Sequence, residues 1–217
     1  LFMKEILYPE QMNYLESFNK EDDALILEME DFARKNSVPI LSRDSAKLME
    51  ILIKMKRPKR VLELGTAIAY TTIRIARNLK KEAVIHTIEF SKDNAKLSEE
   101  NIKKSGVEEK IKLFFGDAKE VMPTLEKKYD FIYLDADKED YLDLFELAMK
   151  LLKKKGVIFV DNLLWHGYAA SDDVPEKYKT STKFIREFNK IFTNYPGLNT
   201  TIIPVGDGIG LGVRKNA

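Results

Sequence analysis

From residue 60 onward, short apolar segments alternate with longer amphipathic segments, and this alternation constrains the fold more than any other feature of the chain. The apolar segments predict strands at Arg60–Leu64, Ala83–Glu89, Lys110–Phe115, Tyr129–Leu134, Val157–Val160, Thr200–Pro204 and Ile209–Arg214. The segments between them predict helices at Tyr70–Leu79, Ser91–Lys104, Tyr141–Lys153 and Ser181–Phe192. Such alternation is typical of parallel strands with helices on both faces, so we predict an α/β fold with a Rossmann-like, doubly wound sheet of seven strands.

The last two predicted strands follow a different pattern from the others. They are joined by Gly206-Asp207-Gly208, a short run that is rich in glycine. Such runs support tight turns between adjacent antiparallel strands. We therefore predict that the C-terminal strands form an antiparallel hairpin at the edge of an otherwise mostly parallel sheet.

The residues before the first strand are predicted to be helical. Glu21–Lys35 carries apolar side chains with a helical period, and a further helix runs from an N-cap at Ser42 to Lys56. We therefore expect N-terminal helices over residues 1–57 to precede a Rossmann-like core over residues 58–217.

Composition bounds the class of protein. A chain of 217 residues with 44% hydrophobic and 33% charged residues can build one packed core, so we predict a single domain over residues 1–217. It has no cysteine, which excludes disulfides, a thiolate nucleophile and a sulfur-ligated metal site. The apolar cluster in Leu1–Tyr8 is too short for a signal sequence or a membrane span. We therefore expect a cytoplasmic protein without a membrane partner.

The first predicted strand ends in Glu63-Leu64-Gly65-Thr66. A dinucleotide site would require further glycines here, because a pyrophosphate needs close backbone approach at a helix N-terminus. The Glu63 carboxylate would repel a phosphate but suits a ligand that carries an ammonium and a sulfonium, such as S-adenosylmethionine. The alternative is an ordinary turn from strand to helix.

Two further strand ends favour a nucleoside ligand. Glu89 ends the second predicted strand, 24 residues beyond Gly65, close to the spacing of about 20 at which an acidic residue binds ribose hydroxyls. The third predicted strand is followed by Gly116-Asp117-Ala118, where Asp117 could accept a hydrogen bond from an adenine amino group. A helix N-cap is an equally good explanation of Asp117.

Oxygen-bearing side chains follow the fourth and fifth predicted strands. Asp135 comes after one, and Asp161 and Asn162 come after the other. Taken singly these are common turn residues, but together they match the donors that Mg²⁺ prefers. The two histidines, His86 and His166, are expected to be structural and not ligands.

These residues give the chain a resemblance to a known family. From Pro39 to Arg214 it resembles the metal-dependent, S-adenosylmethionine-dependent O-methyltransferases of the catechol and caffeoyl-CoA type. The resemblance is carried by Glu63-Leu64-Gly65-Thr66, Tyr70, Glu89, Gly116-Asp117-Ala118, Leu134-Asp135-Ala136 and Val160-Asp161-Asn162. One departure is Ala69, which stands where relatives carry a glycine.

The resemblance implies a role for each of these positions. Asp135, Asp161 and Asn162 would bind magnesium or another hard divalent cation, and Lys138 matches the position of the general base. The residues implied to contact S-adenosylmethionine are Leu41, Glu63, Gly65, Tyr70, Thr71, Glu89, Gly116, Asp117, Ala118 and Asp135. A homodimer is expected by analogy with the family.

Within this family the chain looks most like the bacterial members that methylate 5-hydroxyuridine at the tRNA wobble position. The features are Val38-Pro39-Ile40, Ala67 beside Ile68, Trp165-His166-Gly167 and Ile203-Pro204-Val205-Gly206-Asp207-Gly208. The resemblance therefore implies the tRNA anticodon loop as substrate, with a small catechol-like or caffeoyl-CoA-like hydroxyl as the alternative.

The segment from Leu163 to Thr180 is long for a connection between elements, which favours a substrate-facing lid. Its aromatic and basic residues, Trp165, Tyr168, Lys177 and Lys179, could stack a flipped base and meet phosphates, or enclose a small aromatic molecule. A more distant alternative is a nicotinamide-dependent oxidoreductase or a non-catalytic nucleotide binder. The missing fingerprint glycines disfavour the former, and the three oxygen-bearing residues disfavour the latter.

Overall fold

The computed structural model of the protein describes residues 8–216. The expectation for Leu1–Tyr8 therefore falls almost wholly outside the described residues. Within them, no helix is both long and apolar enough to cross a membrane.

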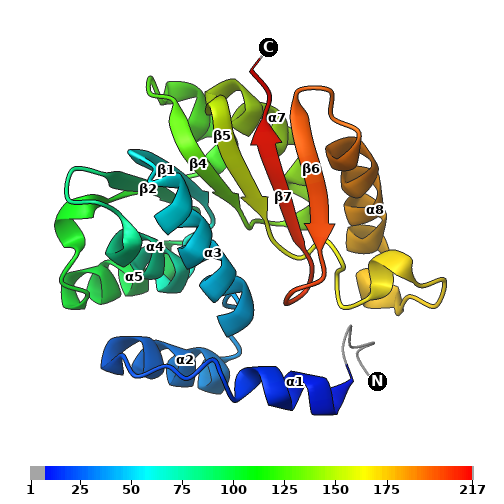
Figure 1. Ribbon diagram of the computed structural model, residues 1–217, viewed down its shortest axis with the longest axis horizontal. Coiled ribbons are helices and arrows are strands. Elements are labelled where there is room, and N and C mark those ends of the chain that lie inside the picture. Colours follow the sequence, from blue (N-terminus) through cyan, green and yellow to red (C-terminus); the bar gives the residue numbers. More distant parts are fainter. Residues whose placement is uncertain (1–7, 217) are drawn as a thin grey trace.

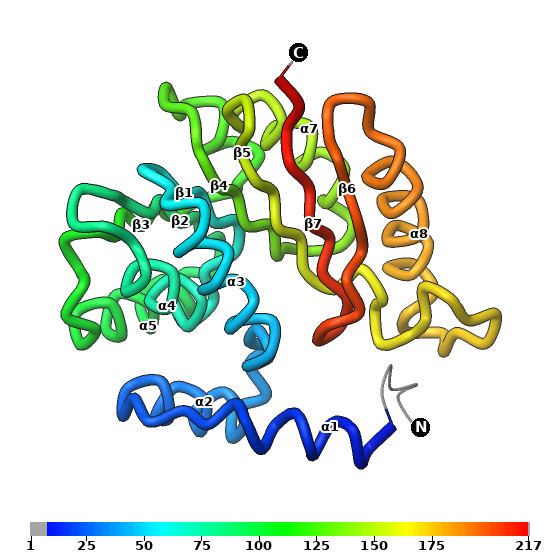
Figure 2. The backbone as a smooth tube through the Cα atoms, viewed as in Figure 1, coloured from blue at the N-terminus to red at the C-terminus, as the bar shows by residue number. Residues whose placement is uncertain are grey.

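Seven strands form one sheet in the order β3-β2-β1-β4-β5-β7-β6 (Figures 1 and 2). The strands are β1 Arg60–Leu64, β2 Val84–Glu89, β3 Ile111–Phe115, β4 Tyr129–Leu134, β5 Leu152–Val160, β6 Leu198–Ile203 and β7 Ile209–Arg214. Strands β1 to β5 pair in parallel, whereas β7 is antiparallel to both β5 and β6. The predicted doubly wound sheet and its C-terminal hairpin are confirmed, with β6 as the edge strand.

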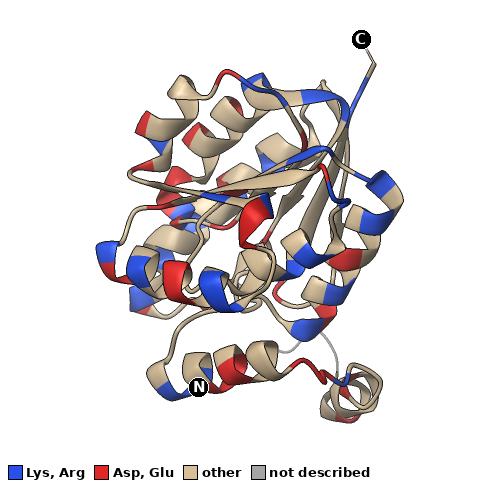
Figure 3. Cartoon of the chain, turned by 90° about the vertical axis from the view of Figure 1, so that its left-hand side faces the viewer, with Lys and Arg blue, Asp and Glu red and all other residues tan. Residues whose placement is uncertain are grey.

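Helices cover both faces of this sheet. They are α1 Pro9–Glu16, α2 Ala24–Asn36, α3 Arg43–Lys56, α4 Tyr70–Asn78, α5 Lys92–Lys104, α6 Ala118–Val121, α7 Tyr141–Leu151 and α8 Lys179–Thr193. Apolar side chains of α2 to α5 share a core with one face of the sheet, and those of α7 and α8 share a core with the other. Acidic and basic residues are interspersed along the outer faces of the helices (Figure 3), as expected for surfaces in contact with water.

The N-terminal prediction is confirmed where it was specific. The Ser42 side chain accepts a hydrogen bond from the Ser45 amide at 3.3 Å, so it caps α3 as expected. The predicted helix Glu21–Lys35 begins later, at Ala24, because Asp23 caps α2 by accepting from the Ile26 amide at 3.0 Å.

The junction between α7 and β5 differs from the prediction. The helix was expected to reach Lys153, but it ends at Leu151, and β5 begins at Leu152 instead of Val157. Leu152 pairs with Tyr129 of β4, and the register then shifts before regular pairing resumes. This irregularity places the lysines after Leu152 in a bulged strand, a pattern that their polar sequence does not predict.

A carboxyl group lies buried within the sheet. Glu63 of β1 has no exposed surface, and its Oε2 accepts a hydrogen bond from the Thr72 hydroxyl of α4. Burial raises the pKa of Glu63 from its ordinary value of 4.5 to about 8. Folded Glu63 therefore keeps its proton over a pH range in which the unfolded chain has lost it.

This difference makes the free energy of unfolding depend on pH. The stabilisation that Glu63 contributes to the free energy of unfolding is fully present below pH 4.5 and is lost as the pH rises toward 8. Because one pKa unit corresponds to about 1.4 kcal/mol, the loss should amount to a few kcal/mol. We expect Glu63→Gln, which cannot ionise, to be more stable relative to the wild type at pH 8 than at pH 5. Urea unfolding of both proteins at the two pH values measures this, and an unchanged stability difference would contradict the buried neutral acid.

Candidate functional site

The candidate site lies at the carboxyl ends of the parallel strands, where the strand order reverses between β1 and β4. Gly65 follows β1 with a φ of 92°, and a Cβ atom there would collide with the backbone oxygen of Asp135, which follows β4. The Asp135 amide donates to the Leu64 carbonyl at 3.0 Å. The two strand ends therefore touch through backbone, and only glycine allows this approach.

Glu89 at the end of β2 organises the loop after Gly65. Its buried carboxylate accepts from the amides of Thr66 at 3.2 Å, Ala67 at 2.8 Å and Ser91 at 2.8 Å. The carboxylate thus fixes the loop between β1 and α4, while its predicted role toward a ribose stays a prediction.

The same loop contains two alanines in left-handed conformations. Ala67 has a φ of 48° and Ala69 a φ of 67°. Ala69 is fully buried at the N-terminus of α4. The family glycine at this position is therefore explained by backbone conformation, and the alanine adopts that conformation at some cost in strain.

Several predicted cofactor residues lie around this loop. Leu41 and Thr71 are buried beside it, and Glu63 lies beneath it with Oε1 buried and without a hydrogen-bond partner among the described residues. The Tyr70 hydroxyl donates to Glu30 of α2 at 2.8 Å. No ligand contact tests these four residues, so their cofactor roles remain predictions.

A buried ion network ties the N-terminal helices to this loop, and sequence reasoning did not find it. Arg74 of α4 contacts Glu21 at 2.6 Å and Glu50 of α3 at 2.8 Å. Its guanidinium also donates to the Tyr70 hydroxyl at 3.3 Å. These partners lie 53 and 24 residues away in the chain, so local sequence patterns give no signal for them.

Gly116, Asp117 and Ala118 lie at the end of β3, next to Glu89. The Gly116 amide donates to the Glu89 carbonyl at 2.9 Å. The Asp117 side chain accepts from the Lys119 amide at 2.8 Å and caps α6, which is the alternative that the sequence left open. The cap and an adenine contact are compatible, because a carboxylate has two oxygens.

Asp135, Asp161, Asn162 and Lys138 converge on the other side of the Gly65 contact. The Lys138 ammonium donates to Asp135 Oδ1 at 3.2 Å and to Asn162 Oδ1 at 2.7 Å. Asp161 is buried, and its carboxylate accepts from the Asn162 amide at 2.7 Å. The predicted gathering of three oxygen donors from two neighbouring strand ends is therefore present.

The electrostatics of these donors fit a cation. Burial, followed by the negative charge of Asp135, raises the pKa of Asp161 well above its ordinary value. A positive ion between the two carboxylates would relieve both effects. Among residues 8–216 no group of three or more His, Cys, Asp or Glu side chains is placed to hold a metal. The candidate donors here are two carboxylates and one amide. Such all-oxygen donors suit a hard divalent cation.

Aromatic rings of the predicted lid border the same donors. The Trp165 ring lies 5.4 Å from Lys138 Nζ, and its indole N–H donates to the Ser181 hydroxyl at 3.1 Å. Tyr168 stacks on Tyr178 with ring centroids 5.2 Å apart. The start of the segment thus lies beside Lys138, and short turns lead from there to α8.

Asp207 is a site residue that sequence reasoning missed, because it was assigned to a tight turn and to a run of residues that supports the resemblance, without a role at the site. It lies between β6 and β7, and its Oδ1 accepts from the His166 amide at 2.6 Å. Burial raises its pKa, while His166, Lys138 and Asn162 act in the opposite direction. By contrast, His86 contacts the Tyr129 hydroxyl at 2.8 Å within the sheet, in agreement with a structural role.

Comparison with known proteins identifies the family. A family model described as O-methyltransferase matches residues 16–215. A caffeoyl-CoA O-methyltransferase of Medicago sativa is 32% identical over 203 residues, covering 88% of this chain and 82% of its own. A catechol O-methyltransferase of Niastella koreensis is 29% identical over 205 residues, covering 90% of this chain and 91% of its own.

Solved structures agree with this assignment. A Staphylococcus aureus protein described as a candidate caffeoyl-CoA O-methyltransferase superposes with a TM-score of 0.87 at 27% identity, over 93% of this chain and 98% of its own. An O-methyltransferase from Bacillus cereus, solved in complex with SAH, gives a TM-score of 0.82 at 25% identity, over 94% and 96%. The chain therefore belongs to the S-adenosylmethionine-dependent O-methyltransferase family of the caffeoyl-CoA and catechol type.

Proposed function

We propose that this chain is a divalent-cation-dependent O-methyltransferase whose acceptor is 5-hydroxyuridine at the wobble position of tRNA. The observation that carries the reaction type is the convergence of Asp135 and Asn162 on one ammonium group beside buried Asp161. The tRNA acceptor is supported by the sequence resemblance and by the surroundings of the lid.

Asp135, Asp161 and Asn162 are the residues that would hold Mg²⁺ or a similar cation. When bound, such a cation orients an acceptor hydroxyl and lowers its pKa. The chain itself keeps the donors in place. Tyr133 donates to Asp135 Oδ2 at 3.3 Å, and Tyr141 donates to the Asp161 carbonyl at 3.0 Å.

Lys138 is proposed to receive the proton. Methyl transfer breaks the bond between sulfur and carbon, forms a bond between oxygen and carbon, and releases the hydroxyl proton. Lys138 is proposed as the acceptor because its Nζ lies beside the Asp135 and Asn162 oxygens, and the step requires its unprotonated amine. Tyr141 and the Ala136 carbonyl, at 2.7 and 3.1 Å, hold the nitrogen there.

The lid favours a flat ring as acceptor. Trp165, His166 and Tyr178 form an aromatic cluster with centroid distances of 5.0 to 6.1 Å. A planar base or phenol can pack against such rings. Both 5-hydroxyuridine and a catechol carry a hydroxyl next to a second oxygen on the neighbouring ring carbon. The aromatic cluster alone therefore does not discriminate between these two acceptors.

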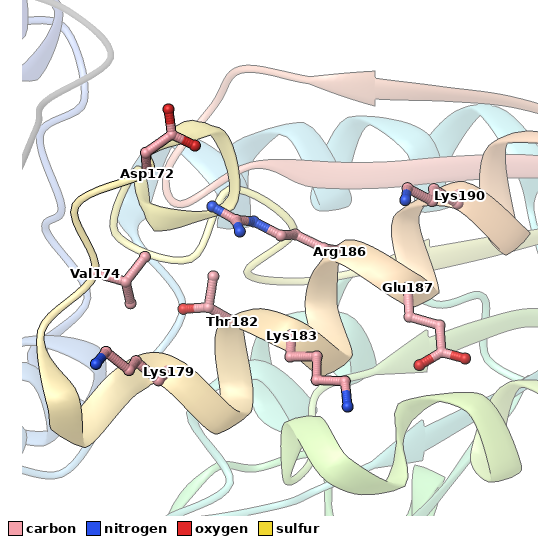
Figure 4. A pocket seen from close by; sticks show the side chains of 8 residues that line it. All are labelled: Asp172, Val174, Lys179, Thr182, Lys183, Arg186, Glu187 and Lys190. Atoms are coloured by element: carbon pink, nitrogen blue, oxygen red, sulfur yellow. The ribbon is translucent and has the colours of Figure 1, made fainter.

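A groove beside the lid favours the larger, polyanionic acceptor. It has a volume of about 560 Å³ and lies between the lid and α8 (Figure 4). Four basic and two acidic side chains line it together with Val174 and Thr182: Lys179, Lys183, Arg186, Lys190, Asp172 and Glu187. An excess of basic groups attracts RNA phosphates, whereas a free catechol carries no phosphate that these groups could bind.

The second candidate acceptor is a small phenol or its coenzyme A thioester. It is favoured by the relatives in Medicago sativa and Niastella koreensis, which are named for caffeoyl-CoA and catechol. The phosphates of a coenzyme A thioester would also suit a basic groove.

The proposal includes a cytoplasmic homodimer. Helix α1 buries none of its residues, and Tyr14, Leu15 and Phe18 at this end of the chain are exposed. A second copy of the chain could cover these side chains, and the mass of the protein in solution tests this.

Loss of a cation donor should abolish transfer without abolishing cofactor binding. We expect Asp161→Ala to lose methyl transfer while binding S-adenosylhomocysteine nearly as the wild type does, because Asp161 lies on the cation side of the Gly65 contact. Calorimetry and a labelled-methyl assay measure the two properties. Asp137→Ala, which removes an exposed carboxylate from the same loop as Asp135, is the control. Normal, chelator-insensitive turnover in Asp161→Ala would refute the cation site.

Lys138→Met tests the proton acceptor. We expect kcat to fall roughly 10²- to 10⁴-fold, the usual contribution of general acid–base catalysis, with little change in KM for S-adenosylmethionine. An unchanged kcat with a raised KM would instead give Lys138 a role in binding.

The acceptor is decided by competition between substrates. Enzyme, Mg²⁺ and labelled S-adenosylmethionine are incubated with tRNA that carries 5-hydroxyuridine, with the same tRNA carrying unmodified uridine, and with catechol. We expect label only in the first, recovered after nuclease digestion as a methylated nucleoside. Label in catechol alone would reject tRNA and support the second candidate.

A further inference from the structure

The turn between β6 and β7 is held more tightly than a surface hairpin requires. Gly206 and Gly208 have φ angles of 58° and 85°. A Cβ atom on Gly206 would collide with Ser42 and Ser45 of α3, and one on Gly208 would collide with Leu164 of the lid. Asp207 is thus fixed between the N-terminus of α3 and the start of the lid.

The lid is bonded to this turn directly after the candidate cation ligands. The Leu163 amide donates to the Gly208 carbonyl and the Leu164 amide to the Asp207 carbonyl, both at 2.9 Å. The His166 amide then donates to Asp207 Oδ1 at 2.6 Å. Three backbone groups of the lid are therefore held by the hairpin, and one of them by a charged side chain.

The bonded part of the lid has a strained backbone. Asn162, Trp165 and His166 have φ angles of 61°, 47° and 56°, in the left-handed region that non-glycine residues seldom adopt. Such a conformation carries backbone strain and persists only where the surrounding structure holds it. The bond to Asp207 is made by His166, within this strained run.

The Asp207 carboxylate also faces the donor group. Its Oδ2 is buried without a hydrogen-bond partner among the described residues and lies 3.7 Å from His166 Nδ1. Asn162 and Lys138 are close enough to stabilise its charge. If the Asn162 NH₂ turned toward this carboxylate, the Asn162 oxygen would be left for a cation. In agreement, Asn162 Oδ1 accepts from Lys138.

We propose that Asp207 is a positioning residue that locks the start of the lid over the site and turns the Asn162 oxygen toward the bound cation. The lid half of this inference stands on hydrogen bonds and backbone geometry. The half that concerns Asn162 rests on the proposed cation-dependent function. Asp207 itself is assigned no contact with the cation or the acceptor.

The chain contains one tryptophan, Trp165, which lies in the locked segment and reports its geometry without any turnover. Asp207→Ala should release the turn, so that Trp165 emission shifts to the red and acrylamide quenches it faster. Asp207→Asn keeps an oxygen for the His166 amide and should leave the emission close to that of the wild type. The control Asp173→Ala removes an exposed lid carboxylate and should change neither property.

Cation affinity is measured separately, by Mn²⁺ titration monitored by electron paramagnetic resonance. Both Asp207 variants should bind Mn²⁺ more weakly, by roughly 10- to 100-fold, as is usual when a group that orients a metal ligand is lost. Circular dichroism of each variant checks folding, and Asp207→Asn keeps the test available if the alanine variant does not fold.

The outcomes separate this inference from the proposed function. If the wild type binds no Mn²⁺, the cation site and the Asn162 half fall together, and Trp165 emission still decides the lid half. If the wild type binds Mn²⁺ and both variants match it in affinity and in emission, the positioning role of Asp207 is refuted while the proposed function stands.

Discussion

The backbone contact between Gly65 and Asp135 joins the two halves of the candidate site. On one side lie the loop held by Glu89 and the end of β3, where family resemblance places the nucleoside; on the other lie the oxygen donors that follow β4 and β5. A sulfonium donor and an acceptor oxygen must meet in line, and about 7–11 kcal/mol of a barrier can come from such positioning in favourable cases. Because the contact is between backbones, it fixes the spacing of the two halves.

The sequence predicts the sheet well because its signals are local. Strands β1, β4 and β7 have the predicted bounds, since each is a short, mainly apolar segment. The donor set was predictable for a related reason: parallel strands that neighbour each other bring their carboxyl ends together, so Asp135 and Asp161 had to be close. The early start of β5 was not predicted from the sequence. Its first pair, Leu152 with Tyr129, depends on a bulge that becomes apparent only from the pairing with the neighbouring strand.

The residues that sequence reasoning missed act across long separations in the chain. Arg74 contacts Glu21, between α1 and α2, and Glu50 of α3, and Asp207 contacts His166, which is 41 residues away. A buried arginine is costly unless paired, so its partners are required by physics, but their identity depends on how the N-terminal helices pack. Asp207 carried the ordinary signal of a turn residue, and its second role appears only once the lid is in place.

The charges around the oxygen donors favour a bound cation. Asp135, Asp161 and Asp207 are three carboxyl groups, and Lys138 is the ammonium group that contacts the first of them. If all three were ionised, the sum with Lys138 would be 1 − 3 = −2, which burial makes unfavourable, and the raised pKa of both Asp161 and Asp207 expresses that cost. A divalent cation would cancel this excess and allow the carboxylates to ionise together. In the proposed site, a bound Mg²⁺ would relieve this repulsion between carboxylates, which would favour its binding.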